Sequence, residues 1–192
     1  MKHMTVSLLC LAMILALSPM REAASLYQGV IRVHILANDD SPEAQAVKLR
    51  VRDRLLREGE RLLSACEDRE AALEILQKNM SGLTAAADEV LKENGFSYGA
   101  RAVLTEEYYE KRDYEGFSLP AGTYLSLKVL LGEGEGKNWW CVLFPRLCLR
   151  AAVTPSVMVE EGLSSGQAEA VSTASGYTLR FKLLDWLASL WR

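Results

Sequence analysis

His34, Asp39, Asp40 and Ser41 lie close together in the sequence and carry the side chains of an acid–base site. A histidine beside a carboxylate can take a proton from a serine hydroxyl, which is the chemistry of nucleophilic hydrolysis. The same residues also suit ordinary structural roles, because Asp40 fits a turn and Ser41 before Pro42 fits a helix N-cap. We favour the structural roles and keep an extracytoplasmic hydrolase or cell-wall-binding domain using His34 and Asp40 as the alternative function.

The sequence has no metal-binding pattern. A calcium loop needs acidic ligands at alternate positions and a glycine at the bend, and the turn containing Asp40 has neither. Zinc sites need closely paired cysteines or histidines, and Cys66, Cys141 and Cys148 do not have that spacing. We therefore expect no metal, no cofactor and no small-molecule substrate.

Two of the cysteines are candidates for a disulfide bond. Cys141 and Cys148 flank a short loop that contains Pro145, and in an oxidising exterior they could close a small ring. Such a cross-link would stabilise the fold by about 2 kcal/mol through its effect on the unfolded chain. The alternative is a pair of buried thiols that pack as small hydrophobic groups, and the spacing leaves both open.

Polar and aromatic side chains in two predicted strands and one turn are candidates for contact with a partner protein. Alternate residues of a strand share a face, so the side chains of Arg32 and His34 lie on the same face. The adjacent Trp139 and Trp140 point to opposite faces of their strand. A tryptophan that the fold leaves uncovered is a good anchor for another protein, whereas one covered within the fold has only a packing role. The candidates are Arg32, His34, Asn38, Asp40, Trp139 and Trp140.

The order of elements predicts an α+β fold. Amphipathic helices are expected over residues 42–64 and 68–92, and period-two strands over 30–36, 96–105, 123–131 and 139–144. The two helices should pack on a small antiparallel sheet, in which the last two strands form a hairpin across the glycine-rich segment between them. Residues 28–153 form the expected domain core, residues 154–176 a loose connection, and residues 177–192 a short C-terminal helix that docks on the domain.

The N-terminus predicts export. Lys2 and His3 precede an uncharged apolar run from Met4 to Met20, which makes residues 1–24 a signal peptide or an N-terminal membrane anchor. Without residues 1–24 the chain has 20 basic and 24 acidic residues and a formal charge of −4. This balance, with no long basic segment, argues against nucleic acid as a partner.

Two blocks of the sequence resemble the stage II sporulation protein R family of endospore-forming bacteria. The first, IRVHILANDDSPEAQAVKLRVRD from Ile31 to Asp53, matches the family's R-x-H-x-x-A-N-x-D-S and Q-x-x-K-x-x-V-R-D motifs. The second, NWWCVLFPRLC from Asn138 to Cys148, follows an LPAG-x-Y segment and a glycine-rich turn that also match. The chain departs from the family pattern at Ala44, at Tyr108 with Tyr109, and at Arg146.

The resemblance implies a signalling protein of sporulation that is not itself an enzyme. It implies export from the forespore into the intermembrane space, where an uncleaved leader would retain the protein at the membrane. The implied partner is a membrane-embedded aspartic protease of the mother-cell membrane, which the signal activates to process the precursor of the mother cell's early sigma factor.

Overall fold

The computed structural model describes residues 26–149 and 153–172 of the chain. The predicted leader, residues 1–24, and the predicted C-terminal helix, residues 177–192, lie outside the described residues. Within the described part, no helix combines the length and the apolar character that crossing a bilayer requires.

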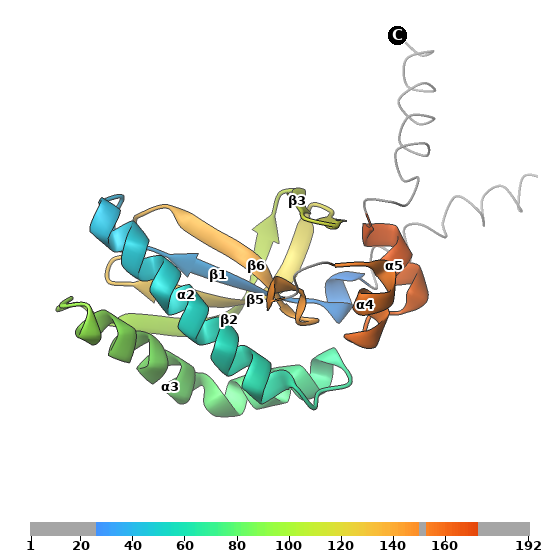
Figure 1. The fold of residues 1–192 in the computed structure, drawn as a ribbon, viewed down its shortest axis with the longest axis horizontal. Coiled ribbons are helices and arrows are strands. Elements are labelled where there is room, and N and C mark those ends of the chain that lie inside the picture. Colours follow the sequence, from blue (N-terminus) through green and yellow to red (C-terminus); the bar gives the residue numbers. More distant parts are fainter. Residues whose placement is uncertain (1–25, 150–152, 173–192) are drawn as a thin grey trace, which may run out of the picture.

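A four-stranded sheet with the order β2-β5-β1-β6 forms the centre of the molecule (Figure 1). Its strands are β1 (Ile31–Leu36), β2 (Ala100–Tyr109), β5 (Gly122–Leu131) and β6 (Asn138–Phe144). The predicted α+β class is confirmed. The sheet is mixed and not purely antiparallel as predicted, because β1 pairs in parallel with β5 and antiparallel with β6.

The predicted hairpin between the last two long strands is wrong. β5 and β6 follow each other along the chain, but β1 lies between them and pairs with both. The glycine-rich segment 132–137 therefore crosses the end of β1 instead of making a tight turn. Its backbone N–H groups bond to β1's continuation, with Glu135 donating to the Asn38 carbonyl at 3.1 Å and Gly136 to the Ala37 carbonyl at 2.9 Å.

Two long helices cover one face of the sheet. α2 (Pro42–Leu63) begins at Ser41, whose hydroxyl accepts from the Ala44 N–H, and α3 (Arg69–Glu93) begins at Asp68 in the same way. Both agree closely with the predicted helices. Their apolar stripes and the helix-facing side chains of the strands bury the larger core. It includes Ile31, Val33, Ile35, Val47, Val51, Leu55, Leu76, Leu83 and Leu127.

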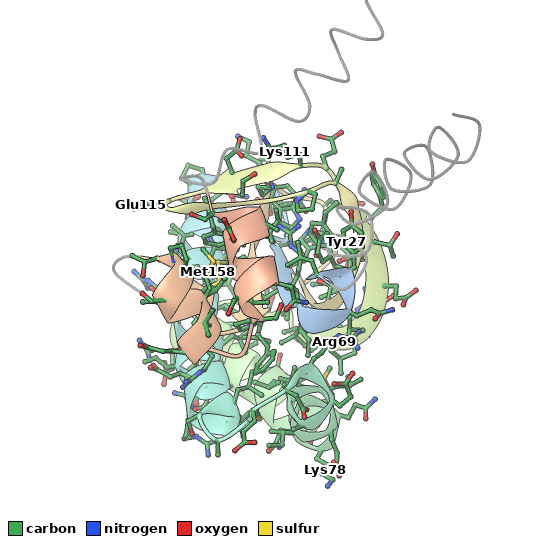
Figure 2. All side chains as sticks on the ribbon, turned by 90° about the vertical axis from the view of Figure 1, so that its right-hand side faces the viewer. Tyr27, Arg69, Lys78, Lys111, Glu115 and Met158 are labelled. Carbon is green, nitrogen blue, oxygen red and sulfur yellow. A yellow bond between two sulfur atoms is a disulfide. The ribbon has the colours of Figure 1, made fainter. Side chains whose placement is uncertain are left out.

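Smaller elements cover part of the opposite face. Figure 2 shows the hairpin of β3 (Arg112–Tyr114) and β4 (Phe117–Leu119), marked by Lys111 and Glu115, on the side of the molecule away from α3. This hairpin was not predicted, because three-residue strands carry too little alternation to be recognised.

Residues 154–176 were predicted to be a loose connection, and the described part of this segment is instead largely helical. Up to residue 171 it contains α4 (Pro155–Glu160) and α5 (Ser165–Val171), both with side-chain N-caps. Met158, Ala168 and Val171 are buried in a second core with Phe117 of the hairpin. The many small and polar residues here cap and connect short helices, which have too few residues for a recognisable period.

Strand β2 is displaced from its prediction. It runs from Ala100 to Tyr109, whereas the alternation had suggested residues 96–105. Gly95 ends α3 with a φ of 81°, as the Asn94-Gly95 pair predicts. Phe96 and Tyr98 then alternate as in a strand, but they pack against the larger core before the pairing with β5 begins.

Candidate functional site

The polar side of β1 begins with a buried arginine. Arg32 is 0% exposed. Its guanidinium carbon lies 3.8 Å from the ring centre of Tyr109 and 5.2 Å from that of Tyr124, and Nη2 donates to the hydroxyl of Tyr114. Among the described residues, its Nε and Nη1 have no hydrogen-bond partner. Arg32 is therefore held by aromatic faces rather than by a carboxylate.

Contact of Arg32 with a partner stays a prediction, and in this structure the side chain is buried beneath aromatic rings. Alternation placed Arg32 and His34 correctly on one face of β1. It did not show that tyrosines from β2, β3 and β5 cover the Arg32 end of that face.

His34 sits at the edge of the covered region and is 8% exposed. Its Nδ1 lies 3.1 Å from a Glu107 carboxylate oxygen, and its Nε2 lies 2.7 Å from Asn138 Oδ1. The ring stacks on Trp140 with centroids 5.3 Å apart. Both nitrogens and one ring face are thus occupied by neighbouring side chains, which makes His34 a fixed part of the sheet face.

Glu107 connects His34 to the neighbouring strands. Its carboxylate also accepts from Lys128 Nζ at 2.7 Å and from the Tyr109 hydroxyl at 3.2 Å. Burial opposes ionisation of Glu107, but the hydrogen bonds from Lys128 and His34 outweigh it, so the pKa of this carboxyl lies below its ordinary value. Glu107 therefore stays charged and holds the two basic groups in place.

The residues of the predicted acid–base group are not assembled as a catalytic site. Asp40 Oδ1 accepts from the Lys137 N–H at 2.7 Å, and the Ser41 hydroxyl caps α2. Asp39 accepts from the Ser41 N–H at 2.7 Å and from Asn38. Hydrogen bonding to the side chain and N–H of Ser41, and then to Asn38, holds the pKa of Asp39 below its ordinary value. None of these residues bonds to His34, so the structural roles that we favoured account for them.

Hydrogen bonds join the turn after β1 to the glycine-rich segment 132–137, and we call this contact the clasp. Asn38 Oδ1 accepts from the Glu133 N–H at 3.0 Å, beside the hydrogen bonds from this segment to Ala37, Asn38 and Asp40 described above. Buried Lys48 of α2 donates to the Lys137 carbonyl at 2.7 Å, and desolvation lowers the pKa of its ammonium group. Asn38 and Asp40 thus position the start of β6, and contact with a partner remains a prediction for them.

Trp139 and Trp140 point to opposite faces of β6, as predicted. Trp139 packs against the larger core, with the Arg52 guanidinium carbon 5.4 Å from its ring centre. Trp140 lies on the other face between His34 and Arg112, whose guanidinium carbon is 4.0 Å from the ring centre. Both tryptophans are only half-buried, so each keeps part of its ring at the surface.

Two cross-strand rows on the face opposite α2 and α3 remain open to solvent, and we name them the open sheet surface. The strand registers align Val103, Lys128, His34 and Trp140 in one row. They align Arg101, Leu130, Leu36 and Asn138 in the next row, in which every residue is half-buried or exposed. This surface joins apolar, aromatic and charged groups, the mixture found in protein–protein contacts.

Cys141 and Cys148 form a disulfide in the structure, with Cα atoms 6.0 Å apart. The bridge joins β6 to the short 3₁₀ helix η1 (Leu147–Leu149). Cys66 is a free thiol. Within residues 26–149 and 153–172, no three histidine, cysteine or acidic side chains gather into a group that could hold a metal ion.

Comparison with known proteins matches residues 27–154 to the family model described as stage II sporulation protein R. A protein named stage II sporulation protein R from Bacillus subtilis (strain 168) is 32% identical over 118 residues, which cover 62% of this chain and 53% of that relative. The match thus spans about half the length of the relative. No solved structure matches the chain significantly.

Proposed function

Because the chain belongs to the stage II sporulation protein R family and therefore has a role in sporulation, we propose that it is an exported signalling protein that activates a membrane-embedded aspartic protease. The protease lies in the mother-cell membrane and processes the precursor of the early sigma factor. The chain acts from the intermembrane space, reached by means of the apolar leader at Met4 to Met20. It contacts the protease and performs no chemistry of its own.

The observation that carries this proposal beyond the family assignment is the open sheet surface. Its anchor is Trp140, which is backed by His34 and Arg112 and lies on the side away from α2 and α3. An aromatic ring held in one position loses little conformational entropy on binding, so it can contribute strongly to a contact. The described residues that suggested a hydrolase have other partners: Asp40 bonds to the Lys137 N–H, the Ser41 hydroxyl caps α2, and His34 is hydrogen-bonded to Glu107.

Reconstitution tests this proposal. Protease, precursor sigma factor and this protein are combined in membranes, and precursor cleavage is followed with each component left out in turn. Cleavage that needs all three components supports an activator. Cleavage of the precursor by this protein without the protease, or by the protease without this protein, contradicts it.

The contact surface is tested by the two adjacent tryptophans. Trp140→Ala removes the anchor of the open sheet surface, and Trp139→Ala on the opposite face serves as the matched control. Both variants lose packing, so activation is compared at a temperature well below the unfolding midpoint of each. We expect at least about tenfold weaker activation for Trp140→Ala, the cost of a typical interface anchor, and near-normal activation for Trp139→Ala. Equal activation by both variants would place the contact elsewhere while leaving the activator role intact.

A further inference from the structure

Strand β2 is an uncovered edge of the sheet. It pairs with β5 on one side, and no strand of the described residues pairs on the other. Gly132 N–H donates to the Gly99 carbonyl, so Gly99 and the odd-numbered residues after it direct their backbone groups toward β5. The even-numbered residues point outward, and Ala100 N–H accordingly bonds to Asp88 of α3 instead of β5. Beyond Ala100, no other strand of the described residues bonds to the outward backbone groups of Ala102, Leu104 and Glu106, and the Glu106 carbonyl accepts only a long bond of 3.4 Å from the Thr105 hydroxyl.

Strand β2 carries charges at Arg101, Glu106 and Glu107 but lacks the other features that protect an exposed edge. The strand runs for 10 residues in unbroken register with β5 and contains no proline. Val103 and Tyr108 are 44% and 70% exposed. Short strands, bulges, prolines and lysines normally prevent such an edge from pairing with another chain. Strand β2 can therefore pair with a strand of another chain.

We propose that β2 pairs antiparallel with β2 of a second copy of this chain, about a two-fold axis through Leu104. The two sheets then join into one, with the outward backbone groups of Leu104 bonding reciprocally and those of Ala102 bonding to Glu106 of the other copy. On the open face of the sheet, this register places Arg101 opposite Glu107 and Val103 opposite Thr105.

Charge complementarity selects both the register and the occupant. Arg101 is exposed and has no ion pair among the described residues, and the Glu107 side chain keeps 16% of its area exposed. An axis through Leu104 brings these two charges together twice. An axis through Val103 places Arg101 opposite the uncharged Thr105. An axis through Glu106 places the two Glu106 carboxylates opposite each other, where they repel. Because one strand supplies both members of each ion pair, a second copy fits this edge better than an unrelated strand.

Sedimentation and site-directed cross-linking of the exported full chain test the proposal. We expect the weight-average mass to rise from monomer to dimer across the micromolar range, as for a small interface. In a Cys66→Ser background, Leu104→Cys on the axis should cross-link at least about ten times faster than Ala102→Cys. The Cα atoms of the two Leu104 residues would lie about 5.5 Å apart, within disulfide reach, and those of the two Ala102 residues about 14 Å apart.

Edge-blocking variants complete the test. Ala102→Pro removes an outward N–H that β5 does not use, and Arg101→Glu removes the charge pair with no change to the backbone. Both should be monomeric at concentrations where the wild type is dimeric, and Val159→Asp, an exposed apolar site on α4, should still dimerise. A wild type that stays monomeric, equal cross-linking of the two cysteine variants, or dimers of Arg101→Glu as strong as wild type would overturn the proposal. If monomeric wild type activates the protease and Ala102→Pro folds but does not, the occupant of β2 is a receptor strand.

Discussion

The clasp between the turn after β1 and segment 132–137 makes Gly136→Ala a severe substitution. A Cβ at Gly136 would lie 2.1 Å from the Asp39 carbonyl oxygen and 2.5 Å from its carbon, and both atoms belong to the backbone. Relief requires the two segments to separate by about 1 Å, since ordinary contact begins above 3 Å. The hydrogen bonds from Glu135, Gly136 and Lys137 to the turn depend on this approach.

The expected cost follows from these contacts. Overpacking against rigid atoms costs about 1–3 kcal/mol, and each weakened hydrogen bond adds about 1 kcal/mol or less. We therefore expect Gly136→Ala to lower the free energy of unfolding by about 3 kcal/mol, and the midpoint of thermal unfolding by roughly 10 °C. Urea unfolding followed by circular dichroism measures the first quantity, with an unchanged m-value confirming the same two-state transition.

Gly82→Ala is the matched control. Gly82 lies inside α3, where a Cβ would meet nothing within 4 Å. The same added methyl should stabilise the protein there, by up to about 1 kcal/mol, because alanine favours a helix over glycine. A loss below about 0.5 kcal/mol for Gly136→Ala, within the range of surface changes, would refute the clasp as a constraint on the fold.

Three further predictions concern the sheet, the disulfide and export. Glu107→Gln should remove part of the stability that the wild type loses in acid: the pKa of Glu107 lies below its ordinary value of 4.5, so this stability is complete above that value and lost as the pH falls below it. The difference in unfolding free energy between the two proteins should therefore shrink between neutral pH and strong acid, and a constant difference would contradict the assignment. Cys141→Ser and Cys148→Ser should each cost about 2 kcal/mol, and mass spectrometry of non-reduced exported protein should show the linked peptides; free thiols at both positions would rule out the bridge. Leu11→Arg should block export, since a central charge costs about 2.5–3.5 kcal/mol on the insertion scale, and normal export of this variant would exclude residues 4–20 as the targeting element.

The helices could be predicted because their signals are local. Ser41 with Pro42 marks the start of α2, Asp68 caps α3 and Gly95 ends it, and each of these roles depends on residues within one helical turn. The order of the strands depends on distant segments. β1 enters between β5 and β6, about 90 and 110 residues later in the sequence, and no local pattern distinguishes this insertion from a hairpin.

The same reasoning explains which part of the site was predicted. Period-two alternation placed Arg32 with His34, and Trp139 opposite Trp140, because it depends only on strand geometry. Burial of Arg32 requires Tyr109, Tyr114 and Tyr124 from three other strands. Only the packing of the β3–β4 hairpin on the sheet shows that these three tyrosines cover the Arg32 end of β1.

The clasp and the open sheet surface are linked through the start of β6. Asp40 and Lys48 fix the two backbone groups of Lys137, the next residue bonds to His34, and Trp140 follows two positions later. A substitution at Asp40 therefore alters the open sheet surface by displacing β6, although Asp40 itself only accepts a hydrogen bond from the Lys137 N–H. Under the proposed function, this arrangement lets polar residues in the turn affect activation without touching the protease. Loss of activation in Asp40→Ala should then be accompanied by altered fluorescence of Trp140, measured against Trp140→Phe in the same background, whereas a direct contact at Asp40 would leave that fluorescence unchanged.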